Sequence, residues 1–384
     1  MKKAKVIHII TMLELGGAQG NTLFTVEHLD LEKFDVGLIS GPGGIQDDAA
    51  RKIENIKLEF VPNLVRPISP IKDFLCLLEL TKILKREAPD IVHTHSSKAG
   101  ILGRLAARSA KVPVIIHSIH GFGFNPYQNF LIRWLFITLE IFIAKFTDIL
   151  VAVSQENIEQ GLRLGIGRRE QYVLIRSGVD IGTIQTSARA TDLSALRKEL
   201  GIADGTKVVF SAGPFKLQKD PVAFVEVAER VLKTVPQTVF IWSGDGELRP
   251  QVEAKIRSLG IGASVKLLGW RKDVPALMAL CDIFVLTSLW EGLPRSAVEA
   301  LILAKPVVAY AVDGVPEIVK DQENGFLIRP GDKGGFAAKL SMLLKDPGLR
   351  GRLSASAVKS IDSTFDIRGM VKAQEGLYSK TLHP

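Results

Sequence analysis

Short apolar runs alternate with segments of helical spacing along almost the whole chain, and this alternation is the feature that most constrains the fold. The clearest example is the stretch 281–310, CDIFVLTSLWEGLPRSAVEALILAKPVVAY. Residues 282–287 and 306–310 are buried-strand runs, and residues 294–304 have helical spacing. A strand, a helix and a second strand in this order predict a βαβ unit with parallel strands.

The alternation repeats often enough to predict two domains. Strand runs at 5–10, 34–40, 58–62, 90–94, 114–118, 147–153 and 172–175 form a first series, and a second begins at 207–212. A chain of 384 residues with 46% apolar residues and 34 glycines is too long for one typical core and fits fully buried parallel strands. We therefore predict two Rossmann-like, doubly wound α/β domains, residues 1–181 and 182–365, with the polar segment 182–192 as a hinge.

The charge and the cysteines limit the partners. A net charge of +8 and a pI near 9.3 favour nucleotide diphosphates or acidic lipid headgroups. The basic residues are scattered through both halves without interleaved aromatics, so nucleic acid is not an expected partner. Cys76 and Cys281 are isolated in apolar segments, which predicts buried thiols in a reducing compartment, with neither a disulfide nor a metal framework.

The sequence offers one candidate for membrane contact. Residues 1–10 form a short strand after a few lysines, with no cleavable signal pattern. The apolar stretch 130–146 is short for a membrane span and is interrupted by Arg133, Glu140 and Lys145. We predict a core helix there, with a membrane-apposed helix as the alternative.

The turn before Pro294 is the first candidate site. Proline is well tolerated at the first position of a helix, so Glu291, Gly292 and Leu293 are expected just before free backbone amides and a positive helix dipole. Such a turn can hold an anionic or hydroxyl-rich ligand. Glu299 follows Glu291 by eight positions, so the two carboxylates can reach different parts of one elongated ligand, although both can equally be solvated side chains.

A second candidate is Gly16-Gly17-Ala18, at a junction between a strand and a helix where a phosphate can approach the backbone. NAD binding is disfavoured because the strand run 34–40 ends in Ser-Gly, without the acidic residue of a dinucleotide fold. The alternative is that the glycines only allow a tight turn.

His93, His95, His117 and His120 invite a metal hypothesis, but their spacing disfavours it. They form no i, i+4 helical pair and have no cysteine partner, and strand alternation aims some of them at opposite faces of a sheet. His120 follows the strand 114–118 at a carboxyl end, where open α/β sheets bind ligands. We expect His95 to be a core imidazole.

The motif Glu291-Gly292-Leu293-Pro294 with Glu299 resembles the E-x7-E signature of retaining glycosyltransferases of family 4, and PDIVHTHSSKAG at 89–100 resembles a phrase frequent in that family. The resemblance extends along almost the whole chain. It implies a B-type fold, with the two domains facing across a cleft and the final helix, about 366–384, crossing back onto the first domain. It further implies that Glu291 contacts the donor sugar, Glu299 the ribose, Gly16 and Gly17 the donor phosphates, and His120 the sugar near the reaction centre.

The same resemblance assigns the donor diphosphate to the segment after the strand 207–212. In the family a Gly-Arg pair and a lysine five residues after the arginine clamp this group; here Gly213 and Lys219 match, while Pro214 replaces the arginine. Lys216 is the candidate for the missing charge, with a solvated turn lysine as the alternative. Lys219 is expected opposite Glu291 across the ligand, where it neutralises the pyrophosphate.

The loop that carries Trp270 and Arg271 lies against the nucleotide base in relatives. No Asp-x-Asp for Mg²⁺ occurs in the sequence, so we expect no metal and no other cofactor.

The resemblance implies transfer of a sugar from a nucleotide-diphosphate donor to a hydroxyl acceptor, with retention at the anomeric carbon. We expect a UDP-linked donor because UDP-sugars are common donors in the family. A basic chain with the apolar stretch 130–146 is compatible with a lipid-linked saccharide acceptor in bacterial cell-surface polysaccharide synthesis. We expect a cytoplasmic protein, peripheral on the inner face of the membrane. The alternatives are a nucleotide-sugar epimerase of the same fold and a non-catalytic nucleotide-sugar-binding partner.

Overall fold

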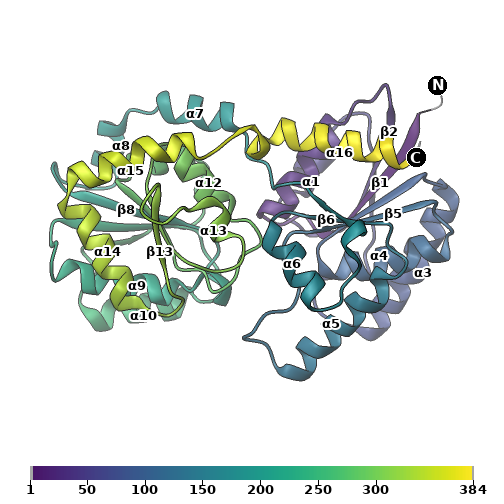
Figure 1. Cartoon of the computed structure of the whole chain (residues 1–384), viewed down its shortest axis with the longest axis horizontal. Coiled ribbons are helices and arrows are strands. Elements are labelled where there is room, and N and C mark those ends of the chain that lie inside the picture. The colour runs from purple at the N-terminus through teal and green to yellow at the C-terminus, as the bar shows by residue number, and fades with distance from the viewer. Residues whose placement is uncertain (1–2, 383–384) are drawn as a thin grey trace. The chain divides into compact units, whose positions relative to one another are not determined.

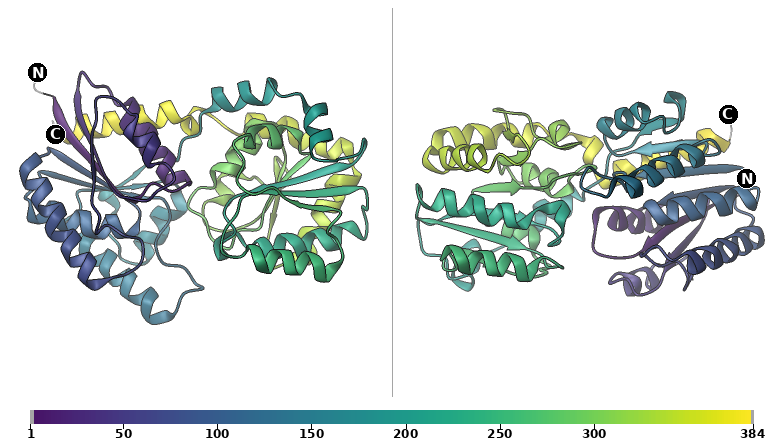
Figure 2. Two further views of the ribbon diagram at one scale, coloured as in Figure 1. Left: turned by 180° about the vertical axis from the view of Figure 1, so that it is seen from behind. Right: turned by 90° about the horizontal axis from the view of Figure 1, so that it is seen from below.

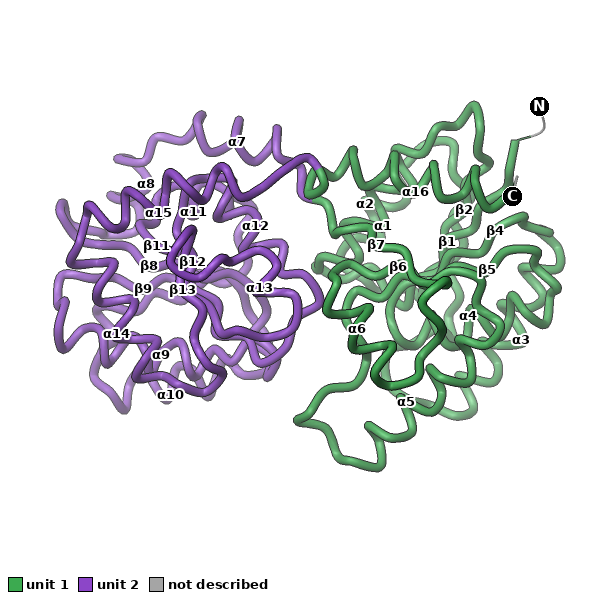
Figure 3. The backbone as a smooth tube through the Cα atoms, in the orientation of Figure 1, with its two compact units in different colours: residues 1–178, 364–384 green, residues 179–363 purple. Residues whose placement is uncertain are grey.

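The computed structural model describes residues 3–382, which divide into two compact units. Unit 1 comprises residues 3–178 and 364–382, and unit 2 comprises residues 179–363 (Figure 3). The chain therefore passes between the units twice, once after Gly178 and once after Ser363.

Unit 1 contains a parallel sheet in the order β3-β2-β1-β4-β5-β6-β7 (Figure 1). Its central strands are continuous apolar runs because parallel strands are covered by helices on both faces. The strands are β1 (Ala4–Met12), β2 (Phe34–Gly41), β3 (Lys57–Phe60), β4 (Ile91–His95), β5 (Val114–Ile119), β6 (Ile149–Ala152) and β7 (Tyr172–Leu174).

The helices of unit 1 cover both faces of this sheet (Figure 2). One face packs its apolar residues on α1 (Gly17–His28) and α16 (Ile367–Leu382), and the other on α3 (Pro70–Glu87) and α4 (Ser97–Ser109). The remaining helices are α2 (Asp47–Arg51), α5 (Phe130–Ala144), α6 (Gln155–Arg163) and the 3₁₀ turns η1 (Arg169–Gln171) and η3 (Ser363–Phe365), the last of which straddles the unit boundary.

A buried ion pair joins α4 to α5. Arg104 is fully buried, and its Nη2 donates to Glu140 Oε2 at 2.7 Å. Its Nε donates to the Gly100 carbonyl at 2.7 Å, so the guanidinium is held by backbone as well as by the carboxylate. Burying a charge is tolerable only with such partners.

Unit 2 repeats the same strand order, β10-β9-β8-β11-β12-β13, again parallel throughout. Its strands are β8 (Lys207–Ala212), β9 (Thr238–Ser243), β10 (Val265–Leu267), β11 (Ile283–Leu286), β12 (Val307–Tyr310) and β13 (Gly325–Ile328). Its helices are α7 (Ile181–Arg189), α8 (Leu193–Glu199), η2 (Leu217–Lys219), α9 (Pro221–Leu232), α10 (Arg249–Leu259), α11 (Val274–Leu280), α12 (Arg295–Ile302), α13 (Val315–Ile318), α14 (Lys333–Lys345) and α15 (Pro347–Lys359).

The helix α16 belongs to unit 1 although the preceding helices belong to unit 2. Ile367, Met370 and Val371 pack into the same apolar cluster as the first strand. A Cβ on Gly178 would lie 2.4 Å from the Ile367 Cα, so only glycine allows the chain to pass the start of α16 this closely.

These findings confirm the predicted fold class of two doubly wound α/β domains. The segment 182–192, predicted as a hinge, is mostly helix α7, and helix α1 begins at Gly17 instead of Gln19. The polar composition of α7 hid it, because seven of its nine residues, IGTIQTSAR, are small or polar and its apolar stripe is narrow.

Candidate functional site

The first candidate site lies in unit 2, where the strand order reverses between β8 and β11. Lys219, at the end of the loop after β8, forms an ion pair through its Nζ with Oε1 of Glu291, in the loop after β11. Glu291 is 7% exposed and Lys219 14%, so the pair is largely shielded from water. Ligands of open α/β sheets bind outside the carboxyl ends of strands at such a reversal point.

Hydrogen bonds lock these two loops together. Thr287 Oγ1 donates to the carbonyl of Lys219 at 2.9 Å, and the Leu289 amide donates to the Gln218 carbonyl at 2.7 Å. The Gln218 side chain donates in turn to the Trp290 carbonyl at 3.0 Å. The ion pair is therefore held by backbone contacts on both of its sides.

A third loop, after β12, also fixes Glu291. Asp313 Oδ2 accepts the Glu291 amide at 2.7 Å. Asp313 has a positive φ of 39°, which is unusual for a residue with a side chain and indicates a tightly determined turn. Loops that follow three strands thus meet at Glu291.

The helix after this turn starts one residue later than predicted. Pro294 is the N-cap and α12 begins at Arg295, with Gly292 and Leu293 buried in the turn before it. Glu299 lies one turn into α12 and is half buried. Burial raises the pKa of its carboxyl, and the nearby Arg295 charge acts in the opposite direction.

Glycines bring three loops of unit 2 into close backbone contact. Gly213 has φ +147°, and its amide donates to the Ser243 carbonyl at 2.9 Å. A Cβ on Gly244 would lie 1.9 Å from the Gly213 carbonyl oxygen, so a side chain there would displace the loop. The Gly244 amide donates to the Gly269 carbonyl at 2.7 Å. The aliphatic chain of Lys219 lies over Gly213, with Cε 3.3 Å from its ideal Cβ position.

Lys216 contacts Lys219 through the backbone, because its carbonyl accepts the Lys219 amide at 3.0 Å. Lys216 is half buried, and no acidic side chain within residues 3–382 forms an ion pair with it. Arg271 pairs with Asp273 at 2.6 Å and with Glu199 at 3.0 Å, and hydrogen bonding to Asp273 raises its pKa. Trp270 is exposed. The structure therefore leaves Lys216 as an available cation, whereas Arg271 already serves as an ion-pair partner within unit 2.

The predicted glycines of unit 1 lie at the start of α1. Gly16 is its N-cap, in an extended conformation with φ −175°, and Gly17 is the first helical residue. The Gly16 carbonyl accepts the Gly20 amide at 3.0 Å. The helix is 12 residues long and its first turn contains no acidic side chain, so its amino end is electropositive.

The predicted histidines divide between two faces of the unit 1 sheet. His117 contacts Thr94 Oγ1 at 2.9 Å on the α4 face. His95 and His120 are hydrogen-bonded to each other on the opposite face, at 3.3 Å. His8 of β1 joins them, with its Nδ1 3.0 Å from His95 Nε2. The alternation argument was thus right for His117, and the expectation that His95 is a core imidazole agrees with its burial.

His8, His93 and His95 nevertheless form a group that could hold a metal ion. Ring nitrogens of His8, His93 and His95 lie within 4.8 Å of one another, and all three side chains are buried. The contacts that these rings make are with other imidazoles, the Tyr378 phenol and the Ser118 hydroxyl, which are uncharged. A divalent cation enclosed there would lack a compensating charge, which is costly in a buried position. The arrangement is better suited to hydrogen bonding between neutral rings.

Helix α5 exposes apolar side chains, which corrects the prediction of a core helix. Phe130 is 74% exposed and Trp134 64% exposed, and only Glu140, Ile143 and Ala144 of this helix are buried. The start of α3 shows the same property at Ile71 and Phe74, among others. We call the exposed residues of these two helices the apolar surface; they are Ile71, Phe74, Leu75 and Leu78 of α3 and Phe130, Leu131, Ile132, Trp134, Leu135 and Phe142 of α5.

Within residues 3–382 the structure contains no helix with both the length and the hydropathy that a membrane span requires.

A cavity of about 420 Å³ in unit 1 is lined in part by residues of helices α3 and α5. Thr11, Gln19 and Ser96 contribute polar groups to it, and Leu135 and Phe136 of α5 contribute apolar ones. Two ion pairs also line it. Arg66 contacts Glu14 at 2.6 Å, and Lys98 contacts Asp73 at 2.6 Å. This mixture of hydroxyls, charges and apolar side chains suits an amphipathic ligand.

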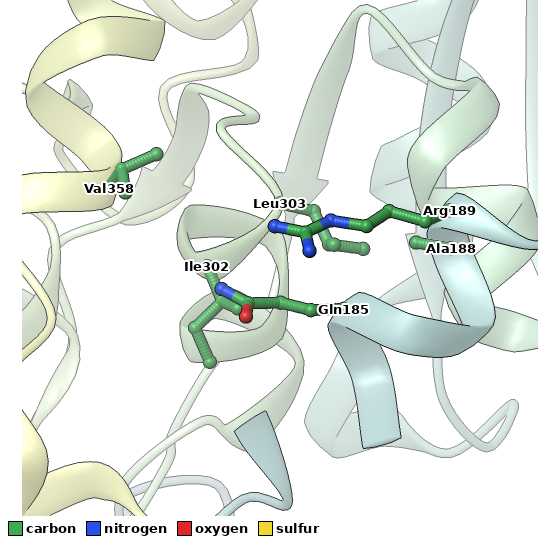
Figure 4. Close-up of a pocket in the computed structure, with 6 residues that line it drawn as sticks. All are labelled: Gln185, Ala188, Arg189, Ile302, Leu303 and Val358. Atoms are coloured by element: carbon green, nitrogen blue, oxygen red, sulfur yellow. The ribbon is translucent and has the colours of Figure 1, made fainter. Parts of the chain in front are cut away.

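A second cavity, of about 290 Å³, lies in unit 2 (Figure 4). Gln185 and Arg189 of α7 extend toward Ile302 and Leu303 at the end of α12, and Val358 of α15 lies on the other side. Its lining, within the described part of the chain, includes none of the predicted site residues. It is therefore separate from the Lys219–Glu291 pair.

Comparison with known proteins identifies the family. A model of Glycosyltransferase Family 4 matches residues 15–183, and a model of Glycosyl transferases group 1 matches residues 193–360. UDP-Gal:alpha-D-GlcNAc-diphosphoundecaprenol alpha-1,3-galactosyltransferase of Escherichia coli is 35% identical over 385 residues, which cover 98% of this chain and 97% of that protein. The chain belongs to the group 1 glycosyltransferases.

A second relative and a solved structure are also similar to this chain. N,N'-diacetylbacillosaminyl-diphospho-undecaprenol alpha-1,3-N-acetylgalactosaminyltransferase of Campylobacter jejuni is 28% identical over 326 residues, covering 82% of this chain and 84% of that protein. Among solved structures, Anabaena HepE in complex with UDP and glucose has a TM-score of 0.84 at 22% identity, covering 98% of this chain and 100% of that one. At that identity the likeness shows the fold alone. The predicted family and glycosyltransferase function are confirmed.

Several residues of the candidate site were not predicted. Thr287 donates to the Lys219 carbonyl, Gln218 donates to the Trp290 carbonyl, and Asp313 accepts from the Glu291 amide. His8 belongs to the histidine group but lies in the first strand, far from the other histidines in sequence. His8 could have been found only indirectly. The strand order of a doubly wound sheet makes β1 and β4 neighbours, which places His8 near the histidines of β4.

Proposed function

We propose that this glycosyltransferase transfers a sugar, with retention at the anomeric carbon, from a UDP-sugar to a hydroxyl of a lipid-linked saccharide in bacterial polysaccharide synthesis. The observation that carries this proposal is the ion pair between Lys219 and Glu291 at the reversal point of the unit 2 sheet. An acid for sugar hydroxyls and a cation for a diphosphate are both needed by a nucleotide-sugar enzyme, and here they are adjacent.

The proposed donor site is in unit 2. Lys219 and Lys216 supply positive charge for the diphosphate, while Glu291 accepts hydrogen bonds from the sugar and Glu299 from the ribose. Charge accumulates on the diphosphate as the bond to the sugar breaks, so preorganised cations stabilise the transition state. One relative, whose name begins with UDP-Gal, and the HepE structure with UDP support the choice of UDP.

The proposed mechanism needs no protein nucleophile. The acceptor oxygen bonds to the anomeric carbon on the face from which the diphosphate leaves, the bond from that carbon to the diphosphate oxygen breaks, and this oxygen takes the acceptor proton. The protein holds the diphosphate and the sugar in place, and His120 and the Gly16-Gly17 turn act from unit 1. We propose that no metal is required, since lysines and a helix amino end can balance the diphosphate charge.

The proposed acceptor site is the 420 Å³ cavity of unit 1. Its hydroxyls and ion pairs suit sugar hydroxyls, and Leu135 in its apolar wall is itself one of the exposed apolar residues of α5. An amphipathic acceptor can therefore place its saccharide in the cavity and its lipid along the helices. Two relatives carry a diphosphoundecaprenol acceptor in their names, which supports a lipid-linked saccharide.

The apolar surface also supports peripheral membrane binding. Phe130 and Trp134 are large, exposed aromatic side chains of α5. Three lysines are exposed on α3, namely Lys72, Lys82 and Lys85. Aromatic side chains insert at the headgroup boundary, and lysines attract anionic lipid. We infer a cytoplasmic protein bound at the inner membrane face.

The central experiment measures nucleotide release from a panel of UDP-, GDP- and ADP-sugars, with and without a lipid-diphosphate saccharide. Transfer that depends on the acceptor, survives EDTA and gives a product of unchanged anomeric configuration by NMR supports the proposal. Conversion of the nucleotide-sugar to its epimer without acceptor would instead indicate an epimerase. Binding without turnover would indicate a non-catalytic partner.

The acceptor site is tested with Leu135→Gln. Burying a leucine against a ligand contributes roughly 1.5–3 kcal/mol, so the KM for the lipid-linked acceptor should rise about tenfold or more while the KM for the donor is unchanged. Met342→Ser is the control, because Met342 is an exposed apolar residue of unit 2. An unchanged acceptor KM would reject the cavity as the acceptor site.

A further inference from the structure

The ammonium that is proposed to hold the donor diphosphate already has a carboxylate partner. Lys219 Nζ forms its ion pair with Oε1 of Glu291, the acid proposed for the sugar hydroxyls. Each of these two groups is therefore a partner of the other as well as a proposed partner of the donor. An anion that reaches the Lys219 ammonium meets a carboxylate that is in contact with the same ammonium.

The surroundings of the pair make its attraction strong. Both side chains are largely shielded from water, so salt and solvent screen the two charges less than they screen a surface pair. Thr287 Oγ1 donates to the Lys219 carbonyl, and Asp313 accepts the Glu291 amide. The backbone of each partner is thus fixed, which keeps the two charged groups within reach of each other.

The diphosphate has few other cations in this loop. Pro214 stands where the family resemblance expects an arginine, so Lys216 and Lys219 are the two cations proposed for the diphosphate. Glu291 balances the charge of one of them. The affinity of the site for a diphosphate therefore depends on whether Glu291 has another partner.

We propose that Glu291 makes the site prefer a nucleotide-sugar over the free nucleotide diphosphate, by competing with the diphosphate for Lys219. This inference rests on the proposed function, in which the sugar hydroxyls donate to Glu291. With a UDP-sugar those hydroxyls satisfy the carboxylate and leave the Lys219 ammonium to the diphosphate. After transfer UDP carries no sugar, so Glu291 pairs with Lys219 again and weakens the binding of UDP. The same carboxylate thus supports donor binding and product release.

The first test measures UDP affinity by isothermal titration calorimetry. Glu291→Gln keeps the size of the side chain and removes its charge, so Lys219 is left to the diphosphate. Exposed ion pairs change an equilibrium by up to about fivefold, and this pair is shielded, so UDP should bind about tenfold more tightly. Unchanged or weaker UDP binding by Glu291→Gln overturns the inference.

Two controls separate this effect from a general change in charge. Uridine has no phosphate, so its affinity should be the same in Glu291→Gln and in the unmodified protein. Glu323→Gln makes the same charge change in unit 2, but Glu323 is exposed and precedes β13, at the opposite edge of the parallel sheet from the loop of Lys219. UDP affinity should be unchanged in this variant. Equal tightening in Glu323→Gln would assign the effect to net charge and reject the competition.

The part played by Lys219 is tested in a Lys219→Met background. Without the ammonium, Glu291 has nothing to compete for, so adding Glu291→Gln should change UDP affinity less than about threefold. A tenfold gain in this background as well would show that Glu291 repels the diphosphate directly, and the competition for Lys219 would be rejected.

The rate of UDP release provides a second measurement. Differences in affinity between variants of one site are mostly differences in dissociation rate, so UDP should leave Glu291→Gln about tenfold more slowly in a stopped-flow displacement experiment. UDP-glucose and UDP-galactose should not bind Glu291→Gln more tightly, because this variant also weakens the acceptor for the sugar hydroxyls. A gain for both UDP-sugars equal to the gain for UDP would contradict the proposed preference.

A second variant covers the case in which Glu291→Gln does not fold. Glu291→Asp withdraws the carboxylate from Lys219 by one methylene and should tighten UDP binding in the same direction, by about threefold; no tightening would overturn the inference. None of these binding measurements needs an acceptor or turnover. An active transferase whose UDP affinity does not respond to Glu291 would reject the inference alone. A protein that shows the predicted UDP affinities but transfers no sugar would contradict the proposed function alone.

Discussion

Lys219 and Glu291 form an ion pair although they are 72 residues apart in the sequence. They meet because β8 and β11 are neighbours at the reversal point of the sheet, so the loops that follow these strands lie at the same edge. Their contact joins a cation proposed for the diphosphate to an acid proposed for the sugar.

Removing Lys219 should reduce both activity and stability. Lys219→Met should lower kcat by about 10²–10³, as expected for loss of one preorganised group at a developing charge. It should also destabilise the protein by on the order of 3 kcal/mol, because the Glu291 carboxylate stays buried without its partner. Steady-state kinetics and urea unfolding measure the two effects.

The double variant Lys219→Met/Glu291→Gln should be less destabilised than the sum of the single variants, since no buried charge remains. Lys233→Met is the control, because its pair with Glu229 is at the surface and should contribute less than about 1 kcal/mol. Additive single and double variants would show that the Lys219–Glu291 pair is energetically unimportant.

Glu299→Gln should separate binding from stability. Burial raises the pKa of Glu299, so its ionised form is unfavourable in the folded protein, and stability from this group falls as pH rises above its ordinary pKa. The neutral glutamine should therefore melt at the same temperature as glutamate or higher at pH 7. Affinity for UDP should fall about 10–100-fold, because a hydrogen bond to a charged group contributes roughly 1.5–3 kcal/mol. Thermal shift with and without UDP measures both; unchanged UDP affinity would refute the ribose contact.

The buried histidines should make the protein sensitive to mild acid. His8, His93, His95 and His117 have lowered pKa values in the folded state, so below about pH 6.5 the unfolded chain binds more protons than the folded one. Stability should be constant above pH 7 and should fall by roughly 1.4 kcal/mol per pH unit for each such histidine below 6.5.

Melting curves between pH 7.5 and 5.5 check this acid sensitivity. His28→Gln should not alter the slope, since His28 is exposed on α1. A melting temperature independent of pH over this range would contradict the prediction.

The buried pair of Arg104 and Glu140 should be replaceable only as a pair. Glu140→Leu alone leaves the guanidinium buried beside an apolar side chain and should cost about 3–5 kcal/mol. Arg104→Met/Glu140→Leu should recover much of that loss, because apolar replacements of a buried pair are often close to neutral. Denaturant unfolding of the two variants gives the comparison. Equal destabilisation of the single and double variants would contradict this interpretation.

The sequence was most informative where burial is uniform. Parallel strands covered on both faces read as continuous apolar runs, so nearly every strand could be located before its neighbours were known. The same logic failed for α5, because an apolar helix looks identical whether its side chains meet a core or remain exposed. It also failed for α7, whose small polar residues read as a linker.

The site was predicted as residues but not as contacts. Motif resemblance selected Glu291 and Lys219 but expected them on opposite sides of a ligand, whereas the fold brings them into direct contact. Such contacts depend on strand order, which cannot be predicted from the local spacing of apolar residues in the sequence. For the same reason His8 was missed: β1 pairs with β4, so His8 lies directly beside His93.

The position of α16 also determines the order in which the protein can be completed during synthesis. Unit 1 begins with the first strand, yet α16, which covers part of one face of its sheet, is translated after all of unit 2. All residues of unit 2 are therefore translated before unit 1 has its full complement. A nascent chain would expose the apolar face around Val6 and Phe34 until Tyr378 emerges, so the unit that starts first is the one that finishes folding last.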